Sequence, residues 1–150
     1  MASEISGDFS IRLMSPNPNN FSDKLINVMA SSLKIAKYLN IPLQSGDSKI
    51  LKIMKRPYTP EQYKLLIKKI RKKIPNINLS TDIIVGFPGE TKKQFENTAK
   101  LMKSLKFNIA YISKYSPRPG TIAFVLKDNI DIKEKKRREK ILKNILNKND

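Results

Sequence analysis

The sequence predicts an α/β fold with about four parallel strands, and three observations lead to this fold class. Short runs rich in β-branched residues alternate with stretches whose apolar residues repeat at helical spacing. Most of the helical stretches begin at a capping signal, and the strand-like runs end at proline or glycine. The order of strand and helix, repeated four times, requires crossover connections, which are right-handed and produce a parallel sheet. With 150 residues the chain has room for one domain, expected to span residues 9–150 after a flexible polar segment, 1–8.

These signals place the individual elements. The strands are expected near residues 9–14, 36–43, 79–85 and 107–114. The helices are expected to begin at Ser22, Ser48, Thr59, Thr91 and Asp131. Thr59 with Gln62, and Thr91 with Gln94, form the Thr-x-x-Gln pattern of a capping box, in which each side chain satisfies a backbone amide of the other residue.

Residues 78–91 are the stretch around which the chain is organised, because they predict a buried strand, a glycine turn and a helix start. The apolar run 83–85 is typical of a strand covered on both faces. Ligands of α/β proteins bind at the carboxyl ends of parallel strands. Asp82, Gly86 and Glu90 are therefore candidates for contact with a nucleotide-like ligand, although an ordinary strand-to-helix loop explains the same residues.

Three further loops are expected at the same edge of the sheet. They comprise residues 15–19, 44–47 and 118–121. Gln44 and Ser45 directly follow a strand, where they either hydrogen-bond a ligand or satisfy the backbone of their own turn. Arg118 stands between two prolines, so it either clamps a carboxylate or phosphate at small entropic cost or pins its loop. Convergence of the four loops on one edge favours the ligand role.

The composition narrows the function classes. A net charge of +17 favours a polyanionic partner, but 24 of the 30 basic residues are lysine, a bias that an A/T-rich genome also produces. The chain contains no cysteine and no histidine, so its own side chains form no disulfide, zinc site or iron–sulfur site of the usual kind. No apolar run approaches the roughly 20 residues of a membrane span, and we expect a cytoplasmic protein.

Four segments of the sequence resemble the radical-SAM tRNA methylthiotransferases. They are Ile-Pro-Leu-Gln-Ser-Gly (41–46), Ile-Leu-Lys-Ile-Met-Lys-Arg-Pro-Tyr-Thr (50–59), Ser-Thr-Asp-Ile-Ile-Val-Gly-Phe-Pro-Gly-Glu-Thr (80–91) and Tyr-Ser-Pro-Arg-Pro-Gly-Thr (115–121). The match runs in order and with the expected spacing from about Ile11 onward. The run Ile-Ser-Lys-Tyr-Ser-Pro-Arg-Pro-Gly-Thr (112–121) is most similar to the archaeal and eukaryotic branch that acts on threonylcarbamoyladenosine.

The resemblance implies a partial (β/α) barrel formed by the later units of a six-unit radical-SAM barrel. In this family S-adenosylmethionine bound to a 4Fe-4S cluster is cleaved to a radical that activates an adenosine beside the anticodon of tRNA, and a second cluster is associated with sulfur insertion. Polar groups at the ends of the later strands hold the cofactor. By position these residues are Gln44, Ser45, Ser80 and Asp82, with Gly86 allowing close approach of the backbone and Arg118 nearby.

Several features of the family pattern are missing. The sequence lacks the Cys-x-x-x-Cys-x-x-Cys loop, and the amino-terminal methylthiotransferase domain and the carboxyl-terminal RNA-binding domain are expected to be absent. Asn17 and Asn40 stand where relatives often have histidine. We therefore expect the isolated chain to be inactive and a second polypeptide to supply the clusters. The alternative is a non-catalytic basic RNA-binding remnant or a gene fragment; within the enzyme class, a ribosomal-protein substrate is a further option.

Overall fold

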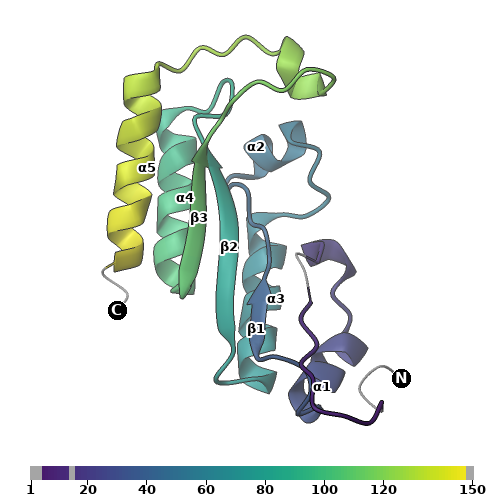
Figure 1. Cartoon of the computed structure of the whole chain (residues 1–150). Helices are drawn as coiled ribbons and strands as arrows, with labels where there is room; N and C mark the ends of the chain where they lie inside the picture. Colours follow the sequence, from purple (N-terminus) through teal and green to yellow (C-terminus); the bar gives the residue numbers. More distant parts are fainter. Residues whose placement is uncertain (1–4, 14–15, 148–150) are drawn as a thin grey trace.

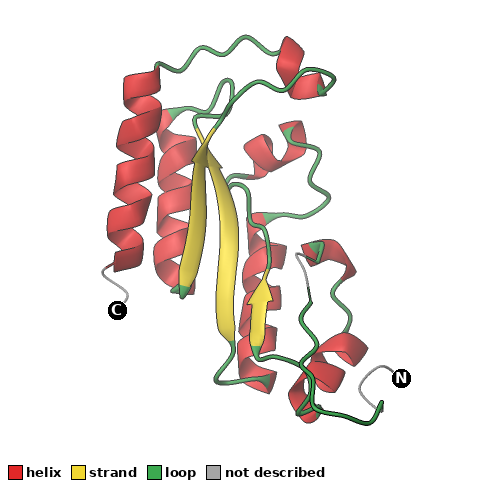
Figure 2. Cartoon of the chain, in the orientation of Figure 1, coloured by secondary structure: helices red, strands yellow, loops and turns green. Residues whose placement is uncertain are grey.

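The structure is a computed structural model that describes residues 5–13 and 16–147, and it shows three parallel strands with a row of helices on one face (Figures 1 and 2). The strands are β1 (Tyr38–Asn40), β2 (Asn78–Val85) and β3 (Ile109–Lys114). The helices are α1 (Asp23–Ser31), α2 (Ser48–Ile53), α3 (Pro60–Lys73), α4 (Lys92–Leu105) and α5 (Ile132–Asn147), with short 3-10 turns η2 (Pro18–Asn20) and η3 (Ile122–Val125). The predicted α/β class is confirmed.

The sheet has the order β1-β2-β3, and both neighbouring pairs are parallel. Asn40 lies opposite Ser80, and Val85 lies opposite Lys114. The carboxyl ends of the strands therefore meet at one edge, which lies at the upper end of the sheet in Figure 1. The loops that follow the strands gather at this edge, as the sequence predicts.

The expectation of four strands is wrong in number. The first expected strand is reduced to one parallel bridge between Ile11 and Ile35, with the Ile11 amide donating to the Lys34 carbonyl. Two prolines that lack amide donors, Pro16 and Pro18, follow this segment and disfavour extension of the ladder beyond it. Residues 14–15, where this strand was expected to end, lie outside the described residues.

The second strand is shorter than the predicted range 36–43. Its regular pairing ends at Asn40, because Pro42 has no amide to donate and Gln44 turns into the left-handed region with φ 65°. The chain then touches β2 once more, through the isolated bridge between Gln44 and Ile83. β1 is therefore extended by a loop that stays attached to the central strand.

The two faces of β2 differ in chemistry, because successive side chains of a strand point to opposite faces. Leu79, Ile83 and Val85 are buried and belong to a hydrophobic core shared with the helices. From the helices this core includes Tyr63, Ile67, Ile70, Phe95, Met102 and Leu142. Each fully buried residue of this size contributes about 1.5–3 kcal/mol to stability. The opposite face of the sheet carries Ser80 and Asp82 beside Ile84 on β2, so it is more polar than the core face and remains available for a site.

Two predicted capping boxes fix where the helices begin. The Thr59 hydroxyl accepts from the Gln62 amide at 3.2 Å, and the Gln62 side chain accepts from the Thr59 amide at 2.8 Å. Thr91 and Gln94 repeat the arrangement at the start of α4. Among the residues that the structure describes, no helix is long and apolar enough to cross a bilayer.

Candidate functional site

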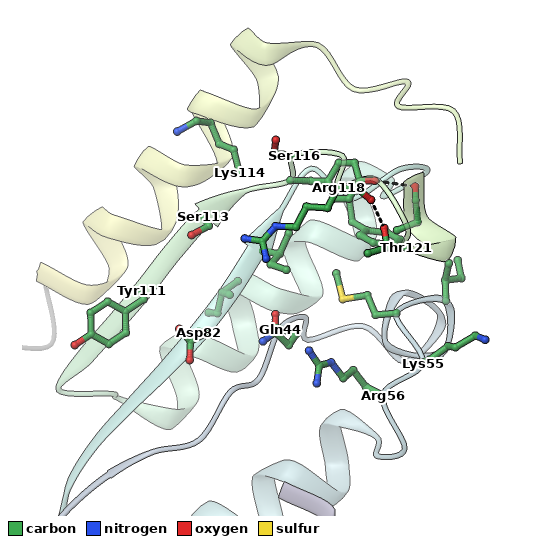
Figure 3. Close-up of a pocket in the computed structure, with 17 residues that line it drawn as sticks. Gln44, Lys55, Arg56, Asp82, Tyr111, Ser113, Lys114, Ser116, Arg118 and Thr121 are labelled. Atoms are coloured by element: carbon green, nitrogen blue, oxygen red, sulfur yellow. Dashed lines mark hydrogen bonds between the residues drawn. The ribbon is translucent and has the colours of Figure 1, made fainter. Parts of the chain in front are cut away.

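A cavity of about 580 Å³ opens at the carboxyl edge of the sheet (Figure 3). Its lining includes Gln44, which follows β1, Asp82 on β2 and Tyr111 on β3. Arg56 enters from the turn after α2, and Arg118 enters from the loop after β3. The volume falls in the range of about 300–1,000 Å³ that is usual for small-molecule and cofactor sites.

Gln44 is the most unusual residue of this cavity. It is only 9% exposed, its backbone has φ 65°, and its side-chain oxygen Oε1 has no hydrogen-bond partner. A left-handed non-glycine residue costs about 1–2 kcal/mol, and a buried unsatisfied acceptor costs about 1–3 kcal/mol. Two such costs at one residue of a cavity indicate a group held ready for a ligand donor.

The backbone around Gln44 is held on the central strand. The Gln44 amide donates to the Asp82 carbonyl at 2.8 Å, and the Ile84 amide donates to the Gln44 carbonyl at 3.0 Å. These bonds continue the parallel pairing past the end of β1. They place the Gln44 side chain next to the Asp82 side of the cavity.

The following residues attach the same loop to α4. The Gly46 amide donates to Thr98 Oγ1 at 2.9 Å, and the Ser45 hydroxyl lies 3.4 Å from the same oxygen. The Asp47 carboxylate accepts from the Asn97 side chain at 2.9 Å. Ser45 is fully buried and directed at α4, so in this structure it supports the loop from behind and does not line the cavity.

Asp82 is oriented by a chain of side-chain hydrogen bonds on the polar face of the sheet. The Tyr38 hydroxyl lies 2.8 Å from Ser80 Oγ, and Ser80 Oγ donates to Asn40 Oδ1 at 2.9 Å. Asn40 Nδ2 donates to Asp82 Oδ2 at 2.8 Å. Ser80 is therefore an internal member of this chain, whereas Asp82 reaches the cavity. A hydrogen bond with Tyr38 also raises the pKa of Tyr111.

Gly86 and Glu90 face α5. A Cβ at Gly86, whose φ is 69°, would lie 2.4 Å from Cγ of Lys135. The Gly86 amide donates to Glu90 Oε2 at 2.8 Å, and Arg138 Nη1 donates to the same oxygen at 2.6 Å. Burial raises the pKa of Glu90, against the opposing effects of these two donors. Neither residue lines the cavity, and both connect the glycine turn to α5.

The predicted site residues thus fall into two groups. Gln44, Asp82 and Arg118 line the cavity, whereas Ser45, Ser80 and Gly86 lie behind its wall. Residues 16–19 of the first predicted loop do not line it, and Ser15 lies outside the described residues. Sequence reasoning missed Arg56 and Tyr111.

Each missed residue left a signal in the sequence. Arg56 lies inside the segment 50–59 that resembles the family, and Tyr111 alternates with buried Ile112 on β3. Alternation of this kind places Tyr111 on the face opposite the helices.

The profile of the Radical SAM superfamily matches residues 2–102. The chain belongs to the radical SAM superfamily. Its relatives include three proteins named tRNA-2-methylthio-N(6)-dimethylallyladenosine synthase. The one from Endomicrobium trichonymphae is 46% identical over 132 residues, covering 88% of this chain and 32% of the relative. Those from Buchnera aphidicola subsp. Baizongia pistaciae and Bacillus subtilis are each 44% identical, covering 99% and 91% of this chain and 34% and 27% of the relatives.

The chain thus spans about a third of the length of these curated relatives. Among solved structures it is similar to coproporphyrinogen III oxidase from Escherichia coli, described as a Radical SAM enzyme. The TM-score is 0.74 and the identity 18%, over 93% of this chain and 32% of that chain. This likeness concerns the fold, and it agrees with the predicted partial barrel.

The relatives support the methylthiotransferase family but not the expected threonylcarbamoyladenosine branch. That expectation rested on residues 112–121, the end of one strand and the loop after it. Identity over 132 residues or more of the chain outweighs one ten-residue motif.

The superfamily implies two cofactors, and the residues present fit only one of them. S-adenosylmethionine fits the cavity, because the unpartnered oxygen of Gln44 and the carboxylate of Asp82 suit its amino and ribose hydroxyl groups. An iron–sulfur cluster does not fit this chain, which has no cysteine and no histidine. Among the described residues no group of three histidine, cysteine or acidic side chains could hold a metal.

Proposed function

We propose that this chain is part of a tRNA methylthiotransferase and that its cavity binds S-adenosylmethionine. The observation that carries the proposal is the buried, unpartnered Oε1 of Gln44 at the carboxyl edge of a radical SAM fold. The similarity to named methylthio-dimethylallyladenosine synthases supports the reaction class. The names of the same relatives favour N6-dimethylallyladenosine over threonylcarbamoyladenosine as the modified base, and tRNA as the partner.

The residues of this chain would bind and orient the cofactor. Gln44 Oε1 would accept a hydrogen bond from the amino group or a ribose hydroxyl of the cofactor, and the Asp82 carboxylate would accept a second one. Both acceptors are held in place before binding. The side-chain amide of Asn40 donates to the Asp82 carboxylate, and the backbone amide of Gln44 donates to the Asp82 carbonyl. When bound, S-adenosylmethionine supplies the methyl group and the adenosyl radical chemistry. The cysteine ligands of the cluster would come from polypeptide outside these 150 residues.

Direct binding tests the proposal. Isothermal titration of the chain with S-adenosylhomocysteine, a non-reactive analogue, should show binding that weakens in Gln44→Ala and Asp82→Ala. One lost buried hydrogen bond costs about 1–3 kcal/mol, which corresponds to roughly five- to 150-fold in affinity. Lys72→Ala, on the exposed side of α3, is the control and should change little.

Gln44→Gly sharpens the test, because glycine adopts φ 65° without strain. This variant should be at least as stable as the wild type and yet lose affinity. If all of these variants bind the analogue equally, or if the wild type does not bind it, the cavity is not a cofactor site and the remnant interpretation is favoured.

A further inference from the structure

The cavity carries positive charge that the proposed cofactor contacts do not use. Lys55 and Arg56 line it from the turn after α2, and Arg118 lines it from the loop after β3. Within the described part of the chain, none of these three side chains forms a salt bridge. Lys114, a fourth cation of the lining, does have a partner, because its amine lies 2.6 Å from Glu139. Asp82 is the one carboxylate among the described lining residues.

The two arginines arise from turns whose backbones are hydrogen-bonded. The Arg56 amide donates to the Leu51 carbonyl at 2.9 Å, which closes the turn after α2. The Arg118 carbonyl accepts from the Thr121 hydroxyl at 2.8 Å and from its amide at 3.3 Å. Figure 3 shows both guanidinium groups directed into the space where Gln44 lies. The buried, unpartnered amide oxygen of Gln44 marks the same space as a ligand position.

We propose that Arg56 and Arg118 form a phosphate subsite for the sugar-phosphate backbone of an RNA substrate beside the nucleoside that enters the cavity, with Lys55 contributing only to the positive charge nearby. A guanidinium group offers a planar fork of donors that matches a phosphate in a bidentate manner. An RNA nucleotide carries a phosphate on each side, so two arginines from different loops suit it. The inference deepens the proposed function and uses the same cavity.

The charge balance favours a phosphate over the other available anion, the carboxylate of S-adenosylmethionine. That cofactor carries a sulfonium and an ammonium beside its carboxylate, so its net charge is positive. Three cations without ion-pair partners would repel it on balance, whereas they would attract a phosphodiester. Asp82 is better placed to meet the positive groups of the cofactor, which leaves the arginines for the RNA.

The test compares ligand pairs that differ in one group. Adenosine 5′-monophosphate and adenosine differ by the phosphate, and S-adenosylmethionine and 5′-methylthioadenosine differ by the aminocarboxypropyl tail together with the sulfonium charge that it creates. NMR titrations of the chain should show that the monophosphate binds about tenfold more tightly than adenosine or better. Arg56→Ala combined with Arg118→Ala should abolish that preference. Arg56→Lys combined with Arg118→Lys, which keeps the charges but loses the planar forks, should retain part of it. Both arginines are exposed, and within the described residues their side chains form no hydrogen bond or salt bridge, so thermal unfolding should stay unchanged.

The matched control is Lys72→Ala combined with Lys136→Ala, which removes the same charge from the exposed sides of α3 and α5. This control should keep the phosphate preference. An equal loss in the control, or no preference in the wild type, would overturn the proposal. The same holds if the arginine variants change only the preference for S-adenosylmethionine over 5′-methylthioadenosine.

The cofactor proposal is read out separately. Gln44→Ala should weaken S-adenosylhomocysteine binding without changing the ratio of monophosphate to adenosine affinity. If the phosphate preference is missing while Gln44→Ala still weakens that binding, the phosphate subsite is refuted and the cofactor site stands. If the phosphate preference is found but Gln44→Ala does not weaken S-adenosylhomocysteine binding, the phosphate subsite stands and the cofactor role of the cavity is refuted.

Discussion

One methyl group added at Gly46 should change both the stability of the fold and the geometry of the cavity, and the two effects can be measured separately. A Cβ built at Gly46 would lie 2.5 Å from Cα of Thr98, and 3.0 Å from both the Thr98 nitrogen and the Asn97 oxygen. All three are backbone atoms of α4, so no side chain can move aside to make room. The Gly46→Ala change therefore forces the loop away from α4.

The cost follows from overpacking alone, because the backbone of Gly46 is not in the left-handed region. Overpacking of a well-packed site typically costs about 1–3 kcal/mol. The displacement would also stretch the 2.9 Å bond from the Gly46 amide to Thr98 Oγ1. Gln44 lies two residues earlier in the same loop, so its side chain should lose its position in the cavity.

Urea unfolding and S-adenosylhomocysteine titration measure the two effects. With a denaturant slope of about 1–3 kcal/mol per molar urea, the unfolding midpoint of Gly46→Ala should fall by about 0.5–2 M. The affinity for the analogue should fall at least fivefold.

Gly89→Ala is the matched control. Gly89 has φ 78° and no atom within 4 Å of a new Cβ, so alanine there is strained through the backbone alone, by about 1–2 kcal/mol. The control should thus lose similar stability and keep its affinity. Equal affinities of the two variants, or an unchanged unfolding midpoint for Gly46→Ala, would refute the idea that α4 positions Gln44.

Three further predictions concern stability. Burial raises the pKa of Tyr58 to about 12. The stability contributed by its neutral form is therefore complete below pH 10 and lost as the pH rises towards 12. The urea unfolding midpoint of Tyr58→Phe should consequently fall less between pH 9 and 11 than that of the wild type. A hydrogen bond from Arg137 lowers the pKa of Glu134 to about 2. The contribution of the charged carboxylate to stability is therefore present above the ordinary pKa of 4.5 and lost as the pH falls towards 2. The thermal unfolding temperature of Glu134→Gln should depend less on pH in this range than that of the wild type. Thr91→Ala should cost about 1 kcal/mol by uncapping α4, with Thr91→Ser nearly neutral in urea unfolding.

The parts of the fold that follow from local sequence could be predicted. The capping boxes at Thr59 and Thr91 are decided by residues three positions apart, and the run 83–85 identifies the central strand without reference to the rest of the chain. The first strand could not be judged in this way. Its pairing depends on Ile35, more than twenty residues away, and on the prolines that follow it.

The lining of the cavity was predicted less completely, because contacts between residues far apart in the sequence determine which side chains reach it. Ser45 comes directly after Gln44, yet its hydroxyl lies against Thr98 of α4 and it does not line the cavity. Gly86 follows β2 directly, and its lack of a side chain makes room for Lys135 of α5. Position at a strand end therefore predicts the neighbourhood of the cavity but not which side chains reach it.

One alternation on β2 connects the core with the site. The side chains of Thr81 and Ile83 are buried on the helix side, whereas Asp82 between them is partly exposed at the cavity. A shift of one residue in the register would exchange these faces. It would place a carboxylate in the hydrophobic core, which is far too costly to be populated. The burial that stabilises β2 therefore also fixes the orientation of Asp82. Because the Gln44 amide donates to the Asp82 carbonyl, the same burial fixes the position of Gln44 as well.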